Sequence, residues 1–511
     1  MTEKAAMLSE QQFLELTKKG NLIPIYAEIL GDLETPVSAY YKLAAKAKYS
    51  FLLESVEGEE KIARFSFLAK DPELVFQSKD NVVKITRIQN GKATTESKQI
   101  KDTPLSFIRD ILKQYKFVNI DGLPRFCGGM VGYMSYDIVR FFEKIPARTK
   151  DDLKLPDTLL ILAKDLIIFD HRNHKIKVVS CAHVNPQDSK EKKLKAYKKS
   201  LKIIESMITA LNRPVAVSKN KNGRKASASL ELRVKSSLTE QQFTSIVDKA
   251  KKYIQSGDII QVVLSQRFEV DLKTDPFNIY RSLRVLNPSS YMYYLNFDGI
   301  RIVGSSPELL VRCEDGVVET RPIAGTRPRG ANEKEDADLA KDLLNDPKEK
   351  AEHIMLVDLG RNDLGRVCKG GSVNVSEFMI VEKYSHVMHI VSNVKGLLRN
   401  DKDSFDVLEA TFPAGTVSGA PKIRAMEIIE ELENNRRGLY AGAIGYFSFS
   451  GNLDTCITIR TIVATKNKAY VQAGAGIVAD SNPQNEFNET INKAKAPIKA
   501  IELAYQQFSS T

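Results

Sequence analysis

Residues 349–363 read E-K-A-E-H-I-M-L-V-D-L-G-R-N-D, and the rest of the chain is organised around this stretch. Its apolar residues recur at helical spacing, at Ile354, Met355, Leu356 and Leu359. Glu349, Glu352 and His353 fall at positions i, i+3 and i+4, so they share one face of the expected helix. The stretch therefore predicts a helix that presents acidic side chains along one side.

A second acidic pair lies near the end of the chain. Glu486 and Glu489 stand at i and i+3 in N-E-F-N-E-T-I-N-K-A-K-A, which runs over 485–496. Two helices that each offer a carboxylate can hold one hard, oxygen-seeking ion such as Mg²⁺ between them. The same spacing is also typical of ordinary solvated helix faces, so both interpretations stand at this point.

The composition is that of a soluble globular protein. The chain has 511 residues, of which 42% are hydrophobic and 27% are charged. That length suits about two to four domains, or one large body. No apolar run reaches the length of a membrane span. The first residues, M-T-E-K-A-A-M-L-S-E-Q-Q-F, resemble neither a secretory signal nor a transit peptide, so we expect a cytoplasmic protein.

Cysteine spacing and charge exclude some classes of protein. The five cysteines are scattered without a C-x-x-C pair, which argues against a zinc site and against a disulfide framework. The net charge of +11 suggests nucleic acid as a distant alternative partner. However, the lysine-rich runs at 189–202 and 219–225 lack the interleaved aromatic residues that stack on bases. A solvated surface, or an anionic small substrate, explains the charge better.

The sequence divides near a turn-prone segment. Residues 20–180 are mostly strand-like with turns between, and a lysine-rich helix is expected over 188–212. Residues 213–236 are poor in apolar residues, as in a linker. We therefore expect two regions, an N-terminal one over 1–236 and a C-terminal one over 237–511.

The C-terminal region mixes helices with antiparallel strands. Two Asp-Gly pairs predict hairpin turns, at Asp298-Gly299 and Asp315-Gly316. One helical block is expected over 333–366, three strands over 439–478, and a last helix over 485–506. Strands in meanders with helices grouped between them indicate an α+β protein.

A short sequence motif occurs once in each of the two regions. Gly129-x-x-Gly132-Tyr-x-Ser-Tyr recurs as Gly442-x-x-Gly445-Tyr-x-Ser-Phe. The two copies suggest equivalent strands of two related sheets, with chance as the alternative for so short a match.

Three glycine-containing segments suit an anionic ligand. P-A-G-T-V-S-G-A-P-K (413–422) is a turn that leads into a helix, where free N–H groups and Lys422 favour a carboxylate. R-P-I-A-G-T-R-P-R-G (321–330) offers arginines for a planar dianion. G-A-G-I-V-A (474–479) has the spacing of a dinucleotide fingerprint, but a turn at 480–483 follows instead of a helix. Its glycines still permit close backbone approach to another anion.

Other motifs are absent or ambiguous. The sequence has no G-x-x-x-x-G-K-[ST] phosphate loop and no G-x-S-x-G or G-x-C-x-G elbow, so it predicts no built-in hydrolase or glutaminase. His389 lies on the face of an expected strand, where a satisfied core histidine is the default interpretation. Glu308 in G-S-S-P-E-L-L is equally consistent with a surface acid at a strand end.

Taken together, these segments resemble the chorismate-utilising enzymes. The likeness is continuous over about 237–500 and thinner over 20–180. It implies a regulatory or structural role for region 1–236 and a catalytic role for region 237–511. It also implies antiparallel β-sheets packed as a sandwich with helices outside, with segments of both regions interleaved in the sheets. The motifs that carry it include F-L-L-E-S, G-D-I-I-Q-V-V-L-S-Q-R, S-S-P-E, R-P-I-A-G-T-R-P-R-G, A-E-H-I-M-L-V-D-L-G-R-N-D, F-P-A-G-T-V-S-G-A-P-K, L-D-T-C-I-T-I-R, Q-A-G-A-G-I-V and E-T-I-N-K-A.

The resemblance assigns roles to individual residues. It implies Mg²⁺ held by Glu352 and Glu489. Glu308 would be the general acid for the departing 4-hydroxyl of chorismate, and the catalytic His389 would serve the later loss of pyruvate. Chorismate would contact Gly325, Thr326, Arg327, Tyr440, Arg460, Gly474, Ala475 and Gly476.

Two positions discriminate within the family. Relatives that add water, the isochorismate and salicylate synthases, carry a lysine base where this chain has Gln261. Relatives that make 4-amino-4-deoxychorismate carry a nucleophilic lysine where this chain has Ala324. Without either lysine, the resemblance implies that ammonia adds at C2 to give anthranilate, with Gln261 at a catalytic position. The ammonia would come from a separate glutamine amidotransferase subunit, and the sibling activities are the alternatives.

A regulatory pocket is the last implication of the resemblance. Ser55 in L-L-E-S, together with Ser290, Tyr291 and Met292, resembles the tryptophan feedback pocket of the family. This implies allosteric inhibition by tryptophan. A buried strand end is the alternative interpretation of L-L-E-S.

Overall fold

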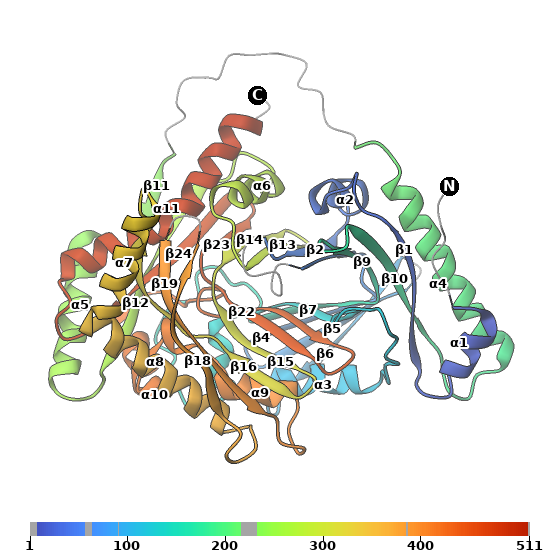
Figure 1. Ribbon diagram of the computed structural model, residues 1–511, viewed down its shortest axis with the longest axis horizontal. Helices are drawn as coiled ribbons and strands as arrows, with labels where there is room; N and C mark the ends of the chain where they lie inside the picture. Colours follow the sequence, from blue (N-terminus) through green and yellow to red (C-terminus); the bar gives the residue numbers. More distant parts are fainter. Residues whose placement is uncertain (1–7, 57–63, 90, 216–231, 385–386, 509–511) are drawn as a thin grey trace.

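Two large antiparallel sheets with helices outside them make up the protein (Figure 1). The computed structural model describes residues 8–56, 64–89, 91–215, 232–384 and 387–508. Most of the expected linker at 213–236 lies outside these residues. The α+β class and the sandwich expected from the family resemblance are confirmed. No helix in the described ranges is long and apolar enough to cross a membrane.

Among the described residues, sheet A has 12 strands, drawn from both regions of the sequence. They are β1 (Leu22–Leu30), β2 (Tyr49–Glu54), β3 (Phe65–Lys70), β9 (Asp165–Asp170), β10 (Lys175–His183), β11 (Val234–Ser236), β12 (Gln261–Asp271), β13 (Tyr291–Phe297), β14 (Ile300–Ser306), β20 (Gly419–Ala420), β23 (Thr461–Thr465) and β24 (Lys468–Ile477). Their order is β1-β10-β9-β3-β2-β13-β14-β23-β24-β12-β11, with β20 also paired to β12.

Sheet B also has 12 strands and lies against sheet A. They are β4 (Leu74–Lys79), β5 (Val82–Gln89), β6 (Lys92–Gln99), β7 (Gly129–Met134), β8 (Thr158–Ala163), β15 (Leu309–Glu314), β16 (Val317–Thr320), β17 (Ile323–Pro328), β18 (Asn374–Lys383), β19 (Val387–Leu397), β21 (Ala443–Ser448) and β22 (Leu453–Ile457). Their order is β17-β19-β16-β15-β22-β21-β7-β8-β4-β5-β6, with β18 also paired to β19.

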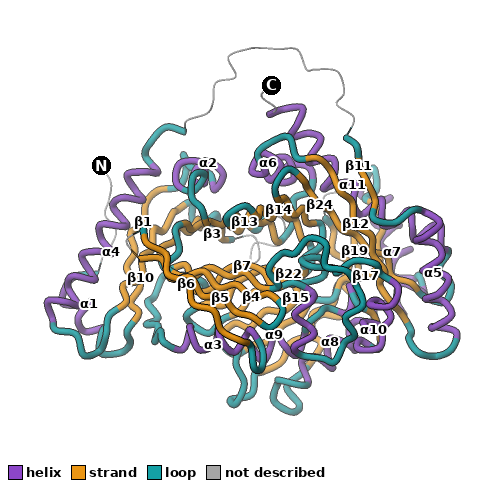
Figure 2. Tube along the Cα trace, turned by 180° about the vertical axis from the view of Figure 1, so that it is seen from behind, coloured by secondary structure: helices purple, strands orange, loops and turns teal. Residues whose placement is uncertain are grey.

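The helices cover the outer faces of both sheets (Figures 1 and 2). They are α1 (Glu10–Leu16), α2 (Pro36–Leu43), α3 (Pro104–Lys113), α4 (Lys190–Leu211), α5 (Glu240–Gln255), α6 (Pro276–Leu286), α7 (Glu333–Asn345), α8 (Pro347–Gly365), α9 (Ser404–Thr411), α10 (Lys422–Leu432) and α11 (Pro483–Phe508), with short 3₁₀ turns at Tyr136–Phe141 and Gly415–Val417. Helices α6 and α11 pack on β14 and β24 of sheet A, while α3 and α9 pack on β7 and β15 of sheet B.

Strand pairings join the two regions of the sequence within each sheet. In sheet A, β2 pairs with β13, and the short β11 pairs with β12. In sheet B, β7 pairs with β21, and Gly132 stands opposite Gly445 in the register. The two copies of the repeated motif therefore lie on neighbouring antiparallel strands of one sheet, and not on equivalent strands of two sheets. The boundary near 236 divides the sequence, but both sheets contain strands from either side of it.

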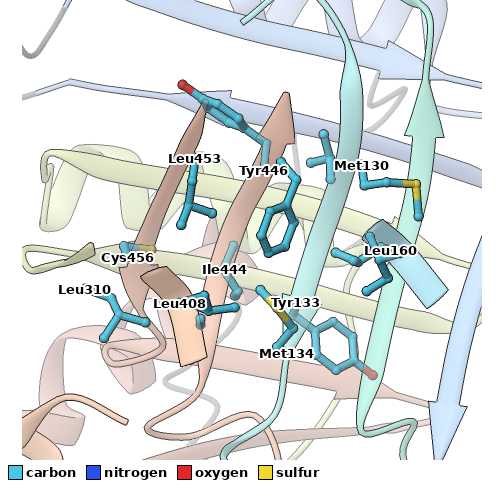
Figure 3. Close-up of a cluster of buried hydrophobic side chains, with 14 of the residues drawn as sticks. Met130, Tyr133, Met134, Leu160, Leu310, Leu408, Ile444, Tyr446, Leu453 and Cys456 are labelled. Atoms are coloured by element: carbon cyan, nitrogen blue, oxygen red, sulfur yellow. The ribbon is translucent and has the colours of Figure 1, made fainter. Parts of the chain in front are cut away.

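The main hydrophobic core lies between the sheets and continues under sheet B. One cluster of buried side chains includes Phe51 and Tyr293 of sheet A together with Met130 and Leu160 of sheet B. Figure 3 shows part of it, where Leu408 of α9 lies beside the strands of sheet B. Burial of apolar side chains from distant parts of the chain in one cluster stabilises the two sheets as one body.

The expected helical block at 333–366 is two helices. Asp346 ends α7 and begins α8, and its side chain accepts hydrogen bonds from the backbone N–H groups of Lys348 (2.9 Å) and Glu349 (3.2 Å). Pro347 follows as the first residue of α8. Proline lacks the N–H that a continuous helix would use, so the chain restarts here with a new cap.

The expectation of three strands at 439–478 was wrong, because this segment forms four. The chain leaves sheet B after β22 and enters sheet A as β23. Arg460, in the link between them, has a φ of 51° and so turns the chain in the left-handed region. The segment therefore connects the two sheets at the edge of the core.

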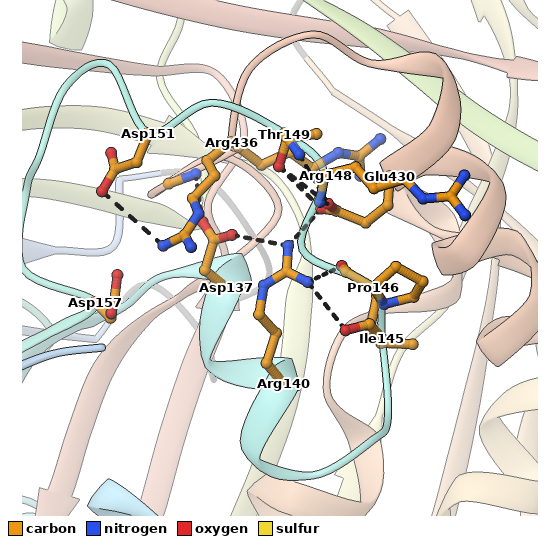
Figure 4. Close-up of polar contacts among 12 residues, drawn as sticks. Asp137, Arg140, Ile145, Pro146, Arg148, Thr149, Asp151, Asp157, Glu430 and Arg436 are labelled. Carbon is orange, nitrogen blue, oxygen red and sulfur yellow. Dashed lines mark hydrogen bonds and ion pairs between the residues drawn. The ribbon is translucent and has the colours of Figure 1, made fainter. Parts of the chain in front are cut away.

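A buried polar network also fastens the N-terminal region to α10 (Figure 4). The Glu430 carboxylate accepts hydrogen bonds from the backbone N–H groups of Arg148 (3.1 Å) and Thr149 (3.3 Å). It also pairs with the Arg140 guanidinium at 2.5 Å. Since a buried charge is tolerated only when it is fully partnered, this carboxylate fixes the loop over 145–149 in place.

The close approach of β21 to β22 yields a stability prediction. A Cβ added at Gly445 would lie 2.0 Å from the carbonyl oxygen of Asp454, so Gly445→Ala should force the strands apart. We expect a loss of about 1–3 kcal/mol in the free energy of unfolding, measured by denaturant titration.

The matched control is Gly365→Ala at the end of α8, where an added Cβ meets no atom within 4 Å. This variant should be neutral or slightly more stable, because alanine favours a helix over glycine. Equal stability of both variants would contradict the packing described for β21.

Candidate active site

The acidic faces of α8 and α11 meet at one place. Burial raises the pKa of Glu352, and the nearby charges of Glu349, Glu486 and Glu489 raise it further. Burial also raises the pKa of Glu486, and the charge of Glu489 adds to that effect. Like charges disfavour each other's ionised form, so these side chains form one group of repelling carboxylates drawn from two helices.

This group fits a hard divalent cation. Three cations lie against it: the Lys348 Nζ is 4.0 Å from Glu352 Oε1, the Arg327 Nη1 is 3.3 Å from Glu349 Oε1, and the Lys493 Nζ is 2.6 Å from Glu489 Oε1. Within the described ranges, no three His, Cys, Asp or Glu side chains already converge as metal ligands. Carboxylate oxygens from only two residues suit Mg²⁺, which keeps several water ligands when it binds to proteins.

The glycine segment of β24 lies beside this group. Gly474, Ala475 and Gly476 pair with β12. A Cβ at Gly474 would lie 2.6 Å from the Tyr440 hydroxyl, and one at Gly476 would lie 2.5 Å from the Nε2 atom of Gln261. The Oε1 atom of Gln261 is buried without a hydrogen-bond partner among the described residues. Glycine therefore leaves a small polar space where these side chains meet the backbone of β24.

Two cations connect that space to the carboxylates. The Lys493 ammonium pairs with Glu489 and also donates to the carbonyl oxygen of Gly474 at 3.1 Å. The Arg460 Nη1 donates to the carbonyl oxygen of Lys493 at 2.8 Å. Burial lowers the pKa of Arg460, while Tyr440 and Glu489 oppose that shift. Positive charge beside a glycine-lined backbone favours a bound carboxylate.

A buried ion pair holds Tyr440 in position. The Arg437 Nη2 is 2.7 Å from Glu433 Oε1, and the side chains are almost fully buried. The Glu433 carboxylate accepts two hydrogen bonds from Ser265 at 2.8 Å, while Arg437 donates to the carbonyl oxygen of Val417 at 2.6 Å. The guanidinium lies 5.5 Å from the centre of the Tyr440 ring. The pair therefore ties β12, the turn at 415–417 and Tyr440 to one another.

Glu308 is a buried acid between β14 and β15, only 7% exposed. Burial raises its pKa to about 8, although the Thr416 hydroxyl and the charge of Lys493 favour the ionised form. A carboxyl group with this pKa keeps its proton at pH 7 and can donate it to a leaving group.

Whereas Glu308 can donate a proton, His389 on β19 can accept one. Its Nδ1 lies 2.8 Å from the carbonyl oxygen of Gly325 and 3.1 Å from the Thr326 hydroxyl. Since the carbonyl can only accept, we assign the proton to Nδ1, which leaves Nε2 as an acceptor. Burial lowers the pKa of the ring. His389 is therefore neutral at pH 7 and can accept a proton at Nε2.

Arg327 is held by three carboxylates, one of which, Glu349, belongs to the acidic group of α8 and α11. Its guanidinium pairs with Asp342 (2.7 Å), Asp346 (2.9 Å) and Glu349 (3.3 Å). These contacts fasten β17 to α7 and α8. Unlike Arg460, this side chain is not presented as a free cation for an anionic ligand.

Electrostatic coupling places the acid and the base at one site. The charge of Lys493 lowers the pKa of Glu308, and the charge of Arg460 lowers the pKa of His389.

Sequence reasoning missed Lys493, although it stands four residues after Glu489 on the same helix face. It also missed Thr416, which lies in the glycine-rich turn already considered for a carboxylate.

A second site lies between the sheets. A cavity of about 550 Å³ is lined by all four residues expected in a tryptophan pocket, Ser55, Ser290, Tyr291 and Met292. The Tyr291 hydroxyl donates to Asp454 at 2.8 Å, and Arg125 and Arg312 pair with the same carboxylate. The Ser55 hydroxyl is buried without a partner in the described part of the chain. Such a volume with a few polar groups is typical of small-molecule sites.

Known proteins resemble the chain over nearly all of its length. Residues 48–499 match the family described as chorismate binding enzyme. The chain is 50% identical to the anthranilate synthase component 1 of Acetivibrio thermocellus, over 96% of this chain and 97% of that protein. It is also 50% identical to the protein of the same name from Aquifex aeolicus, over 97% and 98% of the two chains.

Solved structures resemble the fold. Anthranilate synthase component I from Streptococcus pneumoniae matches with a TM-score of 0.73 and 40% identity, covering 92% of this chain and 98% of that one. MenF, the menaquinone-specific isochorismate synthase from Escherichia coli, matches with a TM-score of 0.68 over 96% and 98% of the chains. At 19% identity, the second likeness supports the fold alone.

The raised pKa of Glu308 yields a spectroscopic prediction. Because its pKa is about 8, the protonated carboxyl band in infrared spectra should lose intensity as the pH rises through about 8. The Glu308→Gln variant should lack this step and keep the other carboxyl steps. A variant that retains the step near pH 8, or a wild type that lacks it, would contradict the protonation state assigned to Glu308.

Proposed function

The chain belongs to the chorismate-binding enzyme family, and from this premise we propose that it is the chorismate-converting component of an anthranilate synthase. The observation that carries the proposal is the 50% identity to two proteins of that name, over almost the whole of both chains. The reaction would convert chorismate and ammonia to anthranilate, pyruvate and water, as the first dedicated step towards tryptophan. We also propose that the protein is located in the cytoplasm.

The choice of ammonia as nucleophile rests on two side chains. Gln261 provides an amide where a base for water would be a lysine, and an amide does not accept a proton at neutral pH. Ala324 on β17 provides no amine that could attack the ring. An external amine must therefore enter the site. The water-adding siblings and the 4-amino-4-deoxychorismate synthases are less well supported for this reason.

The acid and the base divide the reaction into two stages. Ammonia adds at ring carbon C2 while the C4 hydroxyl leaves, and the protonated Glu308 supplies the proton that turns the hydroxyl into water. In the second stage the proton on C2 is removed as pyruvate departs, which makes the ring aromatic. The neutral His389, with Nε2 unprotonated, serves this later stage.

The remaining residues bind and orient chorismate. Arg460, Lys493 and the backbone of Gly474–Gly476 provide positive and polar contacts for its carboxylates, and the buried Tyr440 closes this end of the site. Gly325 and Thr326 hydrogen-bond to the ring of His389, so the backbone of β17 lies beside this histidine. Arg327 contributes by fixing β17 against α8.

Glu352 and Glu489 would hold Mg²⁺, with Glu349 and Glu486 adding negative charge around it. When bound, the ion would neutralise the ring carboxylate of chorismate and act as a Lewis acid for the departing hydroxyl. Lys493 would then be released from Glu489 and become available to the substrate. The enzyme would accordingly be a magnesium-dependent lyase.

The ammonia would come from a second protein. The sequence contains no G-x-C-x-G elbow for a glutaminase nucleophile. The name component 1, carried by the relatives, also implies a further component. We infer a heteromer with a glutamine amidotransferase subunit.

The cavity between the sheets would bind tryptophan as a feedback inhibitor. Tyr291 and Met292, which line it, pair with Ser306 and Ser305 of β14, which lie two and three residues before Glu308. The Ser306 hydroxyl also donates to the carbonyl oxygen of Ile457 at 2.7 Å, close to the turn that carries Arg460. A ligand that moves β13 would therefore displace both the acid and the arginine of the active site.

The proposed reaction predicts a fluorescence result. The purified chain with chorismate, Mg²⁺ and excess ammonium should form fluorescent anthranilate, whereas glutamine in place of ammonium should give none without the partner subunit. Removal of Mg²⁺ by a chelator should abolish the signal.

The controls separate the alternatives. Consumption of chorismate without anthranilate, with isochorismate or salicylate as product, would contradict the proposed function. A salt-sensitive complex with DNA and no change in chorismate would instead favour the nucleic-acid alternative.

Feedback regulation predicts the behaviour of one variant. Ser55→Phe should fill part of the cavity between the sheets, so tryptophan should inhibit this variant at least about tenfold more weakly than the wild type. Activity without tryptophan should change little, because Ser55 does not line the active site. Ser450→Phe, at an exposed turn of sheet B, is the control. Unchanged inhibition of Ser55→Phe would place the tryptophan site elsewhere.

A further inference from the structure

A second cavity lies on the outer face of sheet A, away from the residues of the proposed reaction. It measures about 290 Å³ and is lined by residues of α2, α6, β13 and β14. Figure 1 shows where these four elements lie. Tyr294 and Asn296 of β13 line it, whereas the cavity between the sheets is lined by Tyr291, Met292 and Tyr293 at the start of the same strand. Successive side chains of a strand point to opposite faces, so the two cavities lie back to back across β13.

The floor of this outer cavity is aromatic and already ordered. Tyr40, Phe277 and Tyr294 are only 2–3% exposed. The rings of Tyr40 and Phe277 stack with centroids 4.2 Å apart, and the Tyr294 ring meets both edge-on, at 5.3 Å and 5.0 Å. A rigid aromatic surface of this kind binds apolar or flat groups without further ordering of side chains.

A buried amide in the cavity has an unused acceptor. Asn296 is 4% exposed, and its Nδ2 donates to the carbonyl oxygen of Ala47 at 2.8 Å. That contact fixes the orientation of the amide. The Oδ1 atom is buried and has no hydrogen-bond partner within the described ranges. Buried polar atoms are normally paired, so this oxygen requires a donor from a bound molecule or an ordered water.

Charges of both signs line the same cavity. Asp275, Arg301 and Lys466 all contribute to its walls. None of the three forms an ion pair among the residues that the structure describes. Asp275 is nevertheless fixed in place, because its Oδ1 caps α6 by accepting from the Phe277 N–H at 2.8 Å. The cavity therefore presents one anion and two cations that are not engaged in ion pairs among the described residues, next to an aromatic floor.

We propose that this outer cavity binds a free α-amino acid with an aromatic or large apolar side chain. The ammonium group pairs with Asp275 and donates to the Oδ1 atom of Asn296, while the carboxylate pairs with Arg301 and Lys466. The side chain packs on the aromatic floor. A molecule with only one charge would leave part of the lining unmatched. The inference goes beyond the proposed function and does not rest on it.

The test measures binding of L-phenylalanine to the full chain by calorimetry, without chorismate. We expect a dissociation constant of about 1 mM or tighter. Phenethylamine lacks the carboxylate and 3-phenylpropionate lacks the ammonium group. Each should bind at least about tenfold more weakly, because each loses charge-assisted hydrogen bonds.

Single substitutions test whether L-phenylalanine binds in the outer cavity. Arg301→Gln should weaken L-phenylalanine about tenfold or more, and so should Lys466→Gln, which changes a turn residue and leaves the core untouched. Arg87→Gln, an exposed arginine on β5 of sheet B, is the matched control and should bind as the wild type does. If Arg301→Gln fails to fold, Lys466→Gln still decides the result.

Two results would overturn the proposal. One is the absence of L-phenylalanine binding, or equal binding of the two singly charged analogues. The other is binding that survives both Arg301→Gln and Lys466→Gln but disappears in Ser55→Phe, which would assign the probe to the cavity between the sheets. Because no step of the test involves chorismate, its failure would leave the proposed function untouched.

Discussion

Two strand pairings between distant parts of the sequence hold the whole molecule together. β2 pairs with β13 in sheet A, and β7 pairs with β21 in sheet B. Without them each region of the chain would expose unpaired strand edges, which are prone to aggregation. The cavity between the sheets has walls from both regions for the same reason. Gly132 and Gly445 stand opposite each other in the second pairing, where neighbouring backbones leave no room for a side chain.

Burial then sets the protonation states that the chemistry needs. It keeps Glu308 protonated and His389 neutral, so one site holds a proton donor and a proton acceptor at the same pH. The charge of Glu489 adds to burial in raising the pKa of Glu352, as expected for the two-glutamate cation site that we propose. The charges of Glu433 and Arg437 neutralise each other. This buried ion pair therefore supports the neighbouring residues and does not serve as a binding site for a ligand.

Local patterns predicted the helices and their chemical faces, but not the long-range order. The spacings of Glu349 with Glu352 and of Glu486 with Glu489 predicted two acidic helix faces, but only the family resemblance brought the two faces together and supplied the rest of the site. Strand pairing was not readable, because register between distant strands depends on contacts that leave no local period. The switch between sheets at Arg460 was missed for the same reason. The restart of the helix at Asp346 has a local signal, a capping aspartate followed by proline, which the expectation of one continuous helical block overlooked. The ion pairs of Arg327 depend on α7, whose position no motif indicates.

The central claim is that α8, α11 and the glycine segment of β24 form one chorismate site around a metal ion. Crystals of the chain with Mn²⁺ and benzoate test it most directly, because Mn²⁺ scatters anomalously and benzoate presents a ring carboxylate. We predict one strong anomalous peak between Glu352 and Glu489, with the benzoate carboxylate beside it and the ring along Gly474–Gly476. A peak remote from both glutamates, or benzoate bound only in the outer cavity between α2 and α6, would contradict the account.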